Sequence, residues 1–150
     1  MLTNTLAMPV PFVHRNLPRL LLQARESFMA HARPSLRSHG LSDPQWRVLR
    51  VLGEGGTMET GRIAREAFIL GPSLTGVLAR MERDGLVRRE RDPGDQRRTV
   101  VEATAKGLKL VQKLSQRIEA HYGWIEKSLG KDKLAQLYAL LDDVIELERP

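Results

Sequence analysis

The stretch from Gly71 to Ala103 most limits the folds open to this chain. Gly71 and Pro72 are predicted as the N-cap and first residue of a helix, because proline is tolerated where a backbone amide has no helical partner. The apolar residues that follow recur at the i, i+4, i+7 spacing of a buried helix face: Leu74, Leu78 and Met81. Gly85 can adopt the left-handed conformation that commonly ends a helix. The pattern therefore predicts a helix between Gly71 and Gly85.

A β-hairpin is expected directly after this helix. Residues 86–91 and 98–103 have the composition of strands, and Val87 matches Val100 in character. The turn between them contains Pro93-Gly94, a dipeptide typical of tight turns.

Two shorter helices are expected upstream. Ser42 and Gln45 predict a capping box at the start of the first, and glycines from Gly53 onward end it. The second is predicted over residues 60–67, with Ile63 facing inward. The order helix, turn, helix, hairpin is that of a winged helix-turn-helix.

Three apolar helical stripes flank this unit, at Leu17–Leu36, Leu108–Leu129 and Leu134–Leu147. Pro34 is expected to kink the first helix or to end its regular part near Arg33. Residues 1–14 show no period and are interpreted as an extended arm. The predicted fold class is mainly α with a small β-hairpin wing.

Composition excludes several classes of protein. The chain has 150 residues and no Cys, so a disulfide scaffold, a thiolate zinc site and a thiol nucleophile are excluded. Aromatic residues make up 5%, too few for a platform that stacks single-stranded bases. No apolar run has the ~20 residues of a membrane span. The N-terminus lacks the features of a signal peptide, so a cytoplasmic protein without membrane partners is expected.

The charge pattern is compatible with an anionic partner. The net charge is +6, and every basic residue before Lys106 is Arg, the better bidentate partner for phosphate and guanine. A coding bias towards Arg explains this choice equally well. Composition alone therefore does not establish binding to nucleic acid.

The predicted second helix and hairpin carry the residues that double-stranded DNA would require. Small and hydroxyl side chains permit close approach to bases, and Arg can reach base edges or a neighbouring minor groove. The candidate DNA-binding residues are Ser73, Thr75, Gly76, Arg80, Arg97 and Arg98. Asp95 is expected to orient Arg97, either through its guanidinium or through turn amides. A protein–protein module, with Ser73 as a second N-cap and a solvated Arg edge, is the alternative.

The sequence resembles the MarR family of bacterial transcription regulators over residues 17–148. The resemblance rests on residues 71–89, on the wing element Asp95-Gln96-Arg97 and on Thr104-Ala-Lys-Gly107. Within the family it is most similar to regulators of homoprotocatechuate degradation, through residues 17–26, 45–50 and 69–80. It implies a homodimer that represses from a pseudo-palindromic operator and is released by a small phenolic or aromatic carboxylate.

The resemblance also implies a division of the chain and a ligand pocket. Within one MarR-type domain, we expect an arm and dimerisation helix (1–40), a winged helix-turn-helix (41–103) and C-terminal dimerisation helices (104–150). The candidate effector-binding residues are Arg25, His39, Gln45, Trp46 and Arg50. An ordinary core position for Trp46 and a surface or interface salt bridge for Arg25 are the alternatives. No cofactor or metal is expected.

Other functions are weighed against this one. Catalysis is disfavoured because the four His residues show no metal-ligand spacing and no phosphate-binding Gly pattern occurs. A metal-sensing regulator and a purely structural helical dimer are remote alternatives. Within the regulators, the competing hypothesis is a general drug- or stress-responsive repressor with a broad pocket.

Overall fold

The computed structural model describes Met1 and residues 12–148, so most of the predicted arm (1–14) lies outside the described residues. The helices are α1 (Leu17–Ser38), α2 (Asp43–Gly55), α3 (Thr60–Ala67), α4 (Gly71–Arg83), α5 (Ala105–Leu129) and α6 (Lys131–Ile145). The strands are β1 (Met58–Glu59), β2 (Val87–Asp92) and β3 (Asp95–Ala103). The predicted fold class, a mainly helical winged helix-turn-helix, is confirmed.

Local caps explain why most predicted helix boundaries agree with the structure. The Ser42 side chain accepts a hydrogen bond from the Gln45 amide, and the Gln45 side chain accepts one from the Ser42 amide. Gly85 adopts φ +74° beyond α4, as expected. The N-cap of α4 is Leu70, one residue before the predicted Gly71.

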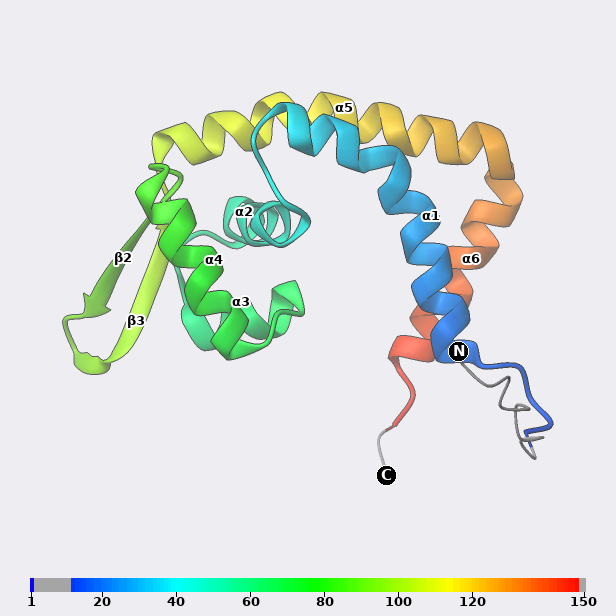
Figure 1. The fold of residues 1–150 in the computed structure, drawn as a ribbon, viewed down its shortest axis with the longest axis horizontal. Helices are drawn as coiled ribbons and strands as arrows, with labels where there is room; N and C mark the ends of the chain where they lie inside the picture. Colours follow the sequence, from blue (N-terminus) through cyan, green and yellow to red (C-terminus); the bar gives the residue numbers. More distant parts are fainter. Residues whose placement is uncertain (2–11, 149–150) are drawn as a thin grey trace.

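Pro34 lies inside α1 rather than ending it, because the helix continues to Ser38. Figure 1 shows α1 bending so that its C-terminal part runs along α5. A proline removes one helical hydrogen bond and crowds the preceding turn, which accounts for a bend at this end of the helix. The kink is therefore the alternative that the structure supports.

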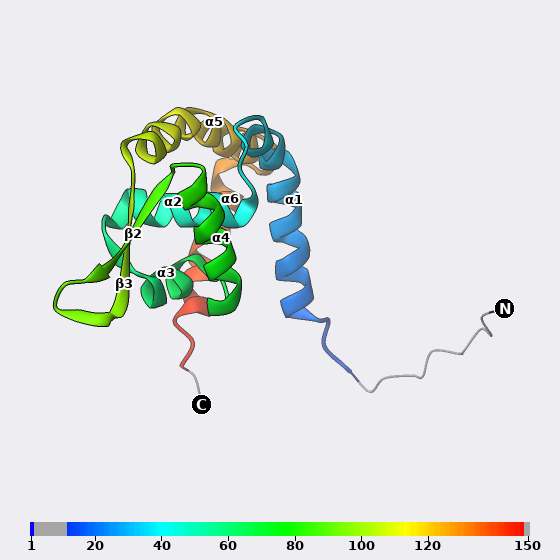
Figure 2. The same cartoon turned by 60° about the vertical axis from the view of Figure 1, so that its left-hand side comes forward.

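The predicted hairpin is present, and a third strand that the sequence did not indicate joins it in a three-stranded antiparallel sheet. β2 and β3 form the expected hairpin, with Val87 opposite Ala103. β1 adds to the other edge of β3, with Met58 opposite Val101. A two-residue strand is too short to produce an alternating pattern, so the sequence carries no signal for it. Figure 2 shows the β2–β3 hairpin projecting beyond α3 and α4.

The main core lies within the winged half and continues along α5, which spans the molecule in Figure 1. Its most completely buried side chains come from α1 to α5 and from the two hairpin strands, and include Leu49, Ile63, Leu78, Met81, Val101 and Leu114. α5 closely approaches the residue before β2 at Gly107, where an added Cβ would lie 2.3 Å from the Leu86 carbonyl oxygen. This contact fixes how the wing joins the long helix.

The three flanking helices leave large apolar side chains exposed. α6 has no buried residue, and exposed apolar residues of these helices include Leu17, Leu22, Trp124, Leu140 and Val144. Soluble proteins rarely expose apolar patches that are not interaction sites. These helices are therefore candidates for contact with a further protein surface.

Candidate functional site

The outer face of α4 presents small and basic side chains. Ser73, Thr75 and Arg80 are exposed, and Gly76 is half-buried. Thr75 Oγ1 donates to the Gly71 carbonyl oxygen at 3.3 Å. Leu70 holds the N-cap position and its side chain cannot accept a hydrogen bond, so the first amides of α4 remain available to an anion.

Asp95 orders the tip of the wing through the backbone. Its Oδ1 accepts a hydrogen bond from the Arg97 amide at 3.0 Å, which is the turn-amide alternative of the sequence prediction. Arg98 is held by Glu59 at 3.0 Å and lies 3.7 Å from Asp95 Oδ2. Within residues 12–148, Arg97 makes no side-chain ion pair. Arg97 is exposed and, like Arg91 of the same hairpin, has no acidic partner among those residues.

A cavity of about 280 Å³ lies between α1, α2, α5 and α6. Its walls are mostly apolar and aromatic, and include Phe28, Leu36, Trp46, Ile125 and Leu137. Ligand pockets in proteins usually measure ~300–1,000 Å³, so this cavity suits a molecule with a single ring.

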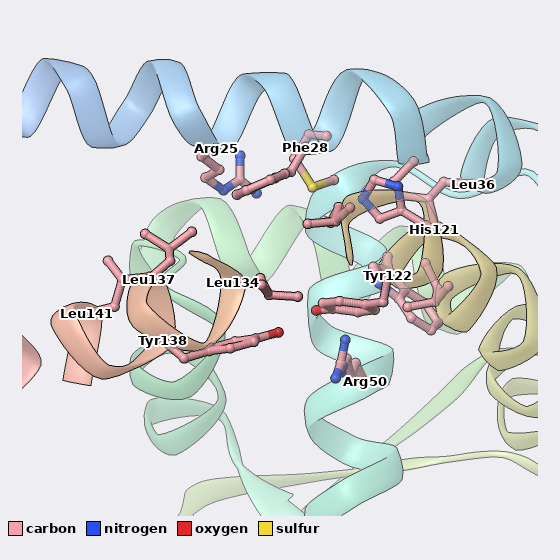
Figure 3. A pocket seen from close by; sticks show the side chains of 15 residues that line it. Arg25, Phe28, Leu36, Arg50, His121, Tyr122, Leu134, Leu137, Tyr138 and Leu141 are labelled. Carbon is pink, nitrogen blue, oxygen red and sulfur yellow. The ribbon is translucent and has the colours of Figure 1, made fainter. Parts of the chain in front are cut away.

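Polar groups gather at one end of the cavity. In Figure 3 the hydroxyls of Tyr122 and Tyr138 point toward one another, with the Arg50 guanidinium beside them. Arg50 also bonds Glu54 at 3.0 Å, an exposed i,i+4 pair. That pair and, secondarily, Tyr122 raise the pKa of Arg50. Surface pairs of this kind contribute ~0–1 kcal/mol, so Arg50 can exchange Glu54 for a bound anion.

His121 lines the cavity and stacks on His31. Burial, and secondarily the neighbouring His31, lower the pKa of His121 below its ordinary value. The two Nδ1 atoms lie 2.6 Å apart, which requires one ring to donate and the other to accept. The guanidinium groups of Arg25 and Arg50 are therefore the permanent cations of the cavity, whereas the lowered pKa of His121 disfavours an imidazolium there.

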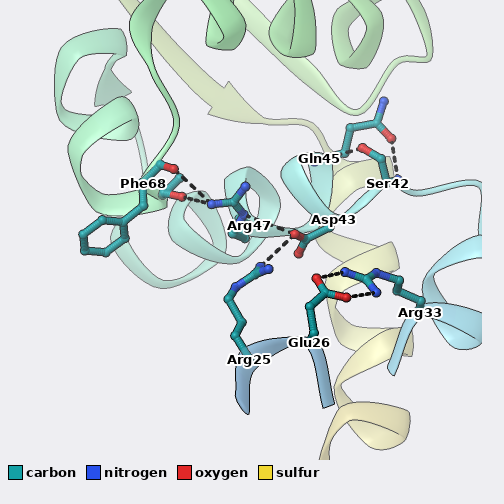
Figure 4. A network of polar contacts seen from close by, with 9 residues as sticks. Arg25, Glu26, Arg33, Ser42, Asp43, Gln45, Arg47 and Phe68 are labelled. Carbon is teal, nitrogen blue, oxygen red and sulfur yellow. Dashed lines mark hydrogen bonds and ion pairs between the residues drawn. The ribbon is translucent and has the colours of Figure 1, made fainter. Parts of the chain in front are cut away.

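Arg25 reaches from the cavity wall to the start of α2. Its Nη2 donates to Asp43 Oδ2 at 2.7 Å, as Figure 4 shows. Asp43 also lies 3.8 Å from Arg47 Nε, and Arg47 donates to the carbonyl oxygens of Ala67 and Phe68 at the end of α3. The salt-bridge alternative for Arg25 is therefore observed, but within one chain.

Comparison with known proteins decides the family. A sequence model of the MarR family matches residues 39–98. The homoprotocatechuate degradative operon repressor of Escherichia coli is 42% identical over 135 residues, which cover 90% of this chain and 91% of that protein. The chain belongs to the MarR family.

Solved structures agree with this assignment. The crystal structure of one transcriptional regulator is 47% identical, with a TM-score of 0.87 over 91% of this chain and 100% of the other. A structure of NadR in complex with 4-hydroxyphenylacetate is 40% identical, with a TM-score of 0.79 over 94% of this chain and 100% of NadR. MarR proteins are DNA-binding transcription regulators and not enzymes, as the sequence predicted.

The structure brings only part of the predicted MarR effector site together. Arg25, Trp46 and Arg50 line the cavity, whereas His39 and Gln45 lie outside it. Gln45 is occupied by the capping box, and the His39 ring is held by the Ser35 carbonyl at 2.8 Å. The structure therefore does not bring these two residues together with the other three.

Sequence reasoning missed part of the polar end of the cavity. Tyr138 is absent from the candidate residues that the sequence suggests, and Tyr122 falls only within the apolar stripe Leu108–Leu129. These are the two tyrosines of the chain, one on each C-terminal helix. A search for rare phenol groups on facing helices could have found them.

The remaining expectations concern metals and membranes. His31 and His121 converge, yet no group of three His, Cys, Asp or Glu side chains suited to a metal occurs in the described part of the chain. Within that part, every helix is too short or too polar to cross a membrane.

Proposed function

We propose that this MarR protein is a homodimeric repressor of an operon for the catabolism of aromatic acids, of the homoprotocatechuate or 4-hydroxyphenylacetate type. A small phenolic acid releases it from its operator. The observation that carries the proposal is the cavity of about 280 Å³ whose apolar walls end in Arg50, Tyr122 and Tyr138. A guanidinium suits a carboxylate, hydroxyls suit polar substituents, and the walls suit a ring.

Likeness to two relatives favours this function over a general drug-responsive repressor. The volume of the cavity does not separate the two, because Arg50, Tyr122 and Tyr138 at its polar end also line an adjoining hollow of about 630 Å³. The likeness to the homoprotocatechuate repressor and to NadR bound to 4-hydroxyphenylacetate supports the same ligand class.

Arg50 is the proposed carboxylate anchor, with Arg25 in a second role. The partner of Arg25, Asp43, has a side chain only 18% exposed, so its carboxylate is shielded from water although the Arg25 side chain is 42% exposed. Glu54, the partner of Arg50, is 70% exposed and readily solvated when displaced. An incoming carboxylate therefore replaces the Glu54 contact at lower cost than the Asp43 contact.

The DNA-reading surface is assigned to α4 and the wing. α4 would occupy the major groove, and the wing would reach the neighbouring minor groove. The assigned residues are Ser73, Thr75, Gly76, Arg80, Arg97 and Arg98, with Asp95 as the group that shapes the turn. Exposed apolar residues on α1, α5 and α6 support dimerisation, which would place two α4 helices on half-sites ~34 Å apart.

The proposal is tested by fluorescence anisotropy on DNA from the promoter region beside the protein's own gene. At physiological salt we expect specific binding, absent with unrelated DNA of equal length and lost on adding 4-hydroxyphenylacetate or 3,4-dihydroxyphenylacetate. Specific binding that neither acid changes would retain the regulator and contradict its proposed ligand class. Equal, weak binding to both DNAs would contradict the operator location.

Replacing Arg50 with alanine is expected to weaken binding of 4-hydroxyphenylacetate about 10- to 100-fold, because a hydrogen bond to a charged group contributes ~1.5–3 kcal/mol. Isothermal titration calorimetry on the free protein measures this loss. The matched control is 4-hydroxyphenylacetamide, which keeps the ring and hydroxyl but carries no charge. Wild-type protein that binds acid and amide equally well would remove Arg50 from this role.

A further inference from the structure

A continuous set of polar contacts runs from the cavity to the turn before α4 (Figure 4). Arg25, in the cavity wall, bonds Asp43 Oδ2 at 2.7 Å. Asp43 lies 3.8 Å from Arg47 Nε. Arg47 Nη1 donates to the Ala67 carbonyl at 2.8 Å and to the Phe68 carbonyl at 3.1 Å. Three helices, α1, α2 and α3, are thus joined through two guanidinium groups and one carboxylate.

Arg47 binds the turn between α3 and α4, whose backbone conformation requires stabilisation by other residues. Phe68 has φ +53°, the left-handed region that non-glycine residues rarely adopt. The residue is 86% exposed, so packing of its side chain contributes little to stabilising this conformation. The last carbonyls of a helix lack helical partners, and Arg47 supplies donors and positive charge there. Because α4 begins at Gly71, the turn sets where α4 starts.

Arg25 and Arg47 share one carboxylate, that of Asp43, so the strength of each ion pair depends on the other. The Asp43 side chain is 18% exposed, and Asp43 Oδ1 and Arg47 Nε are buried without a hydrogen-bond partner among the described residues. A poorly solvated carboxylate that loses one cation strengthens its contact with the other. A change at Arg25 therefore alters the electrostatic interaction between Asp43 and Arg47.

We propose that Arg25, Asp43 and Arg47 are positioning residues that couple the contents of the cavity to the turn preceding α4. A ligand whose carboxylate is held by Arg50 and whose second polar group accepts a hydrogen bond from Arg25 weakens the contact between Arg25 and Asp43, which leaves the Asp43 carboxylate to Arg47. Arg47 then loosens its hold on the Ala67 and Phe68 carbonyls, and the start of α4 becomes mobile. The ligand-dependent part rests on the proposed function, whereas the link between Arg25 and the turn does not.

Amide hydrogen exchange on the full chain tests the link without any ligand. In Arg25→Ala, we expect exchange at Phe68 and Ile69 to accelerate about fivefold or more, although Arg25 touches neither residue. Both amides bond Ala64 or Arg65 carbonyls at the end of α3 and so report on that turn. Amides of α5 near Leu114 report global stability and are expected to change less than about twofold.

A second variant and a control distinguish a specific link between Arg25 and the turn before α4 from a general effect of removing a charge. Asp43→Asn keeps the shape of the side chain but removes the charge that would draw Arg47 away from the Ala67 and Phe68 carbonyls, so it is expected to give no such acceleration. Arg33→Gln removes a bidentate pair with Glu26 that lies within α1 alone, and is expected to leave the turn unchanged. Wild-type exchange at Phe68 and Ile69 in Arg25→Ala, or equal acceleration throughout α5, would overturn the proposal.

Adding 4-hydroxyphenylacetate distinguishes the two proposals. We expect bound acid to accelerate exchange at the turn in wild-type protein and to add nothing in Arg25→Ala. Acid that binds by calorimetry without changing the turn would overturn the coupling and leave the ligand assignment intact. If the acid does not bind while Arg25→Ala still accelerates exchange locally, the proposed function fails and the link between Arg25 and the turn is upheld.

Discussion

Gly107→Ala is expected to lower the free energy of unfolding by about 2–3 kcal/mol, although alanine is the better helix former by ~1 kcal/mol. The added Cβ would lie 2.3 Å from the Leu86 carbonyl oxygen and 3.3 Å from Leu49 Cδ2. The Leu86 carbonyl cannot readily retreat, because it accepts a hydrogen bond from the Thr104 amide at 3.0 Å. Urea denaturation followed by far-ultraviolet circular dichroism measures the loss.

Gly123→Ala is the matched control, because Gly123 lies in the same helix and an added methyl group there would meet nothing within 4 Å among the described residues. At this position the helix propensity acts alone, and an increase in stability of about 0.5–1 kcal/mol is expected. The two substitutions should therefore have opposite signs. A stabilising effect at both sites would show that α5 does not press against the Leu86 carbonyl.

Elements with strong local signals were predictable from the sequence. The capping box of Ser42 and Gln45 and the left-handed Gly85 depend on residues within a few positions of one another. The role of Gly107 was not predictable in this way. The sequence marks Thr104-Ala-Lys-Gly107 only as part of a family resemblance, and its physical reason is the Leu86 carbonyl, which folding brings against it. The β1 strand was missed for the same reason, because pairing with β3 defines it.

The candidate sites likewise include one that neighbouring residues in the sequence predict and one that only the folded structure reveals. The wing tip is formed by residues that are close together in the sequence, so the interaction of Asp95 with the turn could be predicted. The cavity is built by four helices, and no local pattern identifies Tyr138 as a neighbour of Arg50. Gln45 was placed in two roles by the sequence, and a side chain already satisfied within a capping box is not free for the second.

Arg97→Ala is expected to weaken specific operator binding by about 1–3 kcal/mol, or roughly 5- to 150-fold, as for loss of an Arg that reads DNA. The physical reason is that the Asp95 carboxylate fixes the Arg97 amide while the guanidinium projects without an acidic partner in residues 12–148. Little desolvation of an existing ion pair then opposes its contact with DNA. Anisotropy titrations on the intact operator measure the loss at fixed salt, because salt changes such affinities strongly.

Arg98→Ala supplies the comparison that makes this prediction specific. Arg98 already interacts with Glu59 at 3.0 Å and with Asp95 at 3.7 Å, so contact with DNA must compete with two carboxylates. Its removal is therefore expected to cost less operator affinity than removal of Arg97, at equal change in net charge. Arg97→Lys should give an intermediate loss, because a lysine keeps the charge but not the planar fork of donors. A larger loss for Arg98→Ala than for Arg97→Ala would mean that the wing rearranges on DNA and releases Arg98 from Glu59.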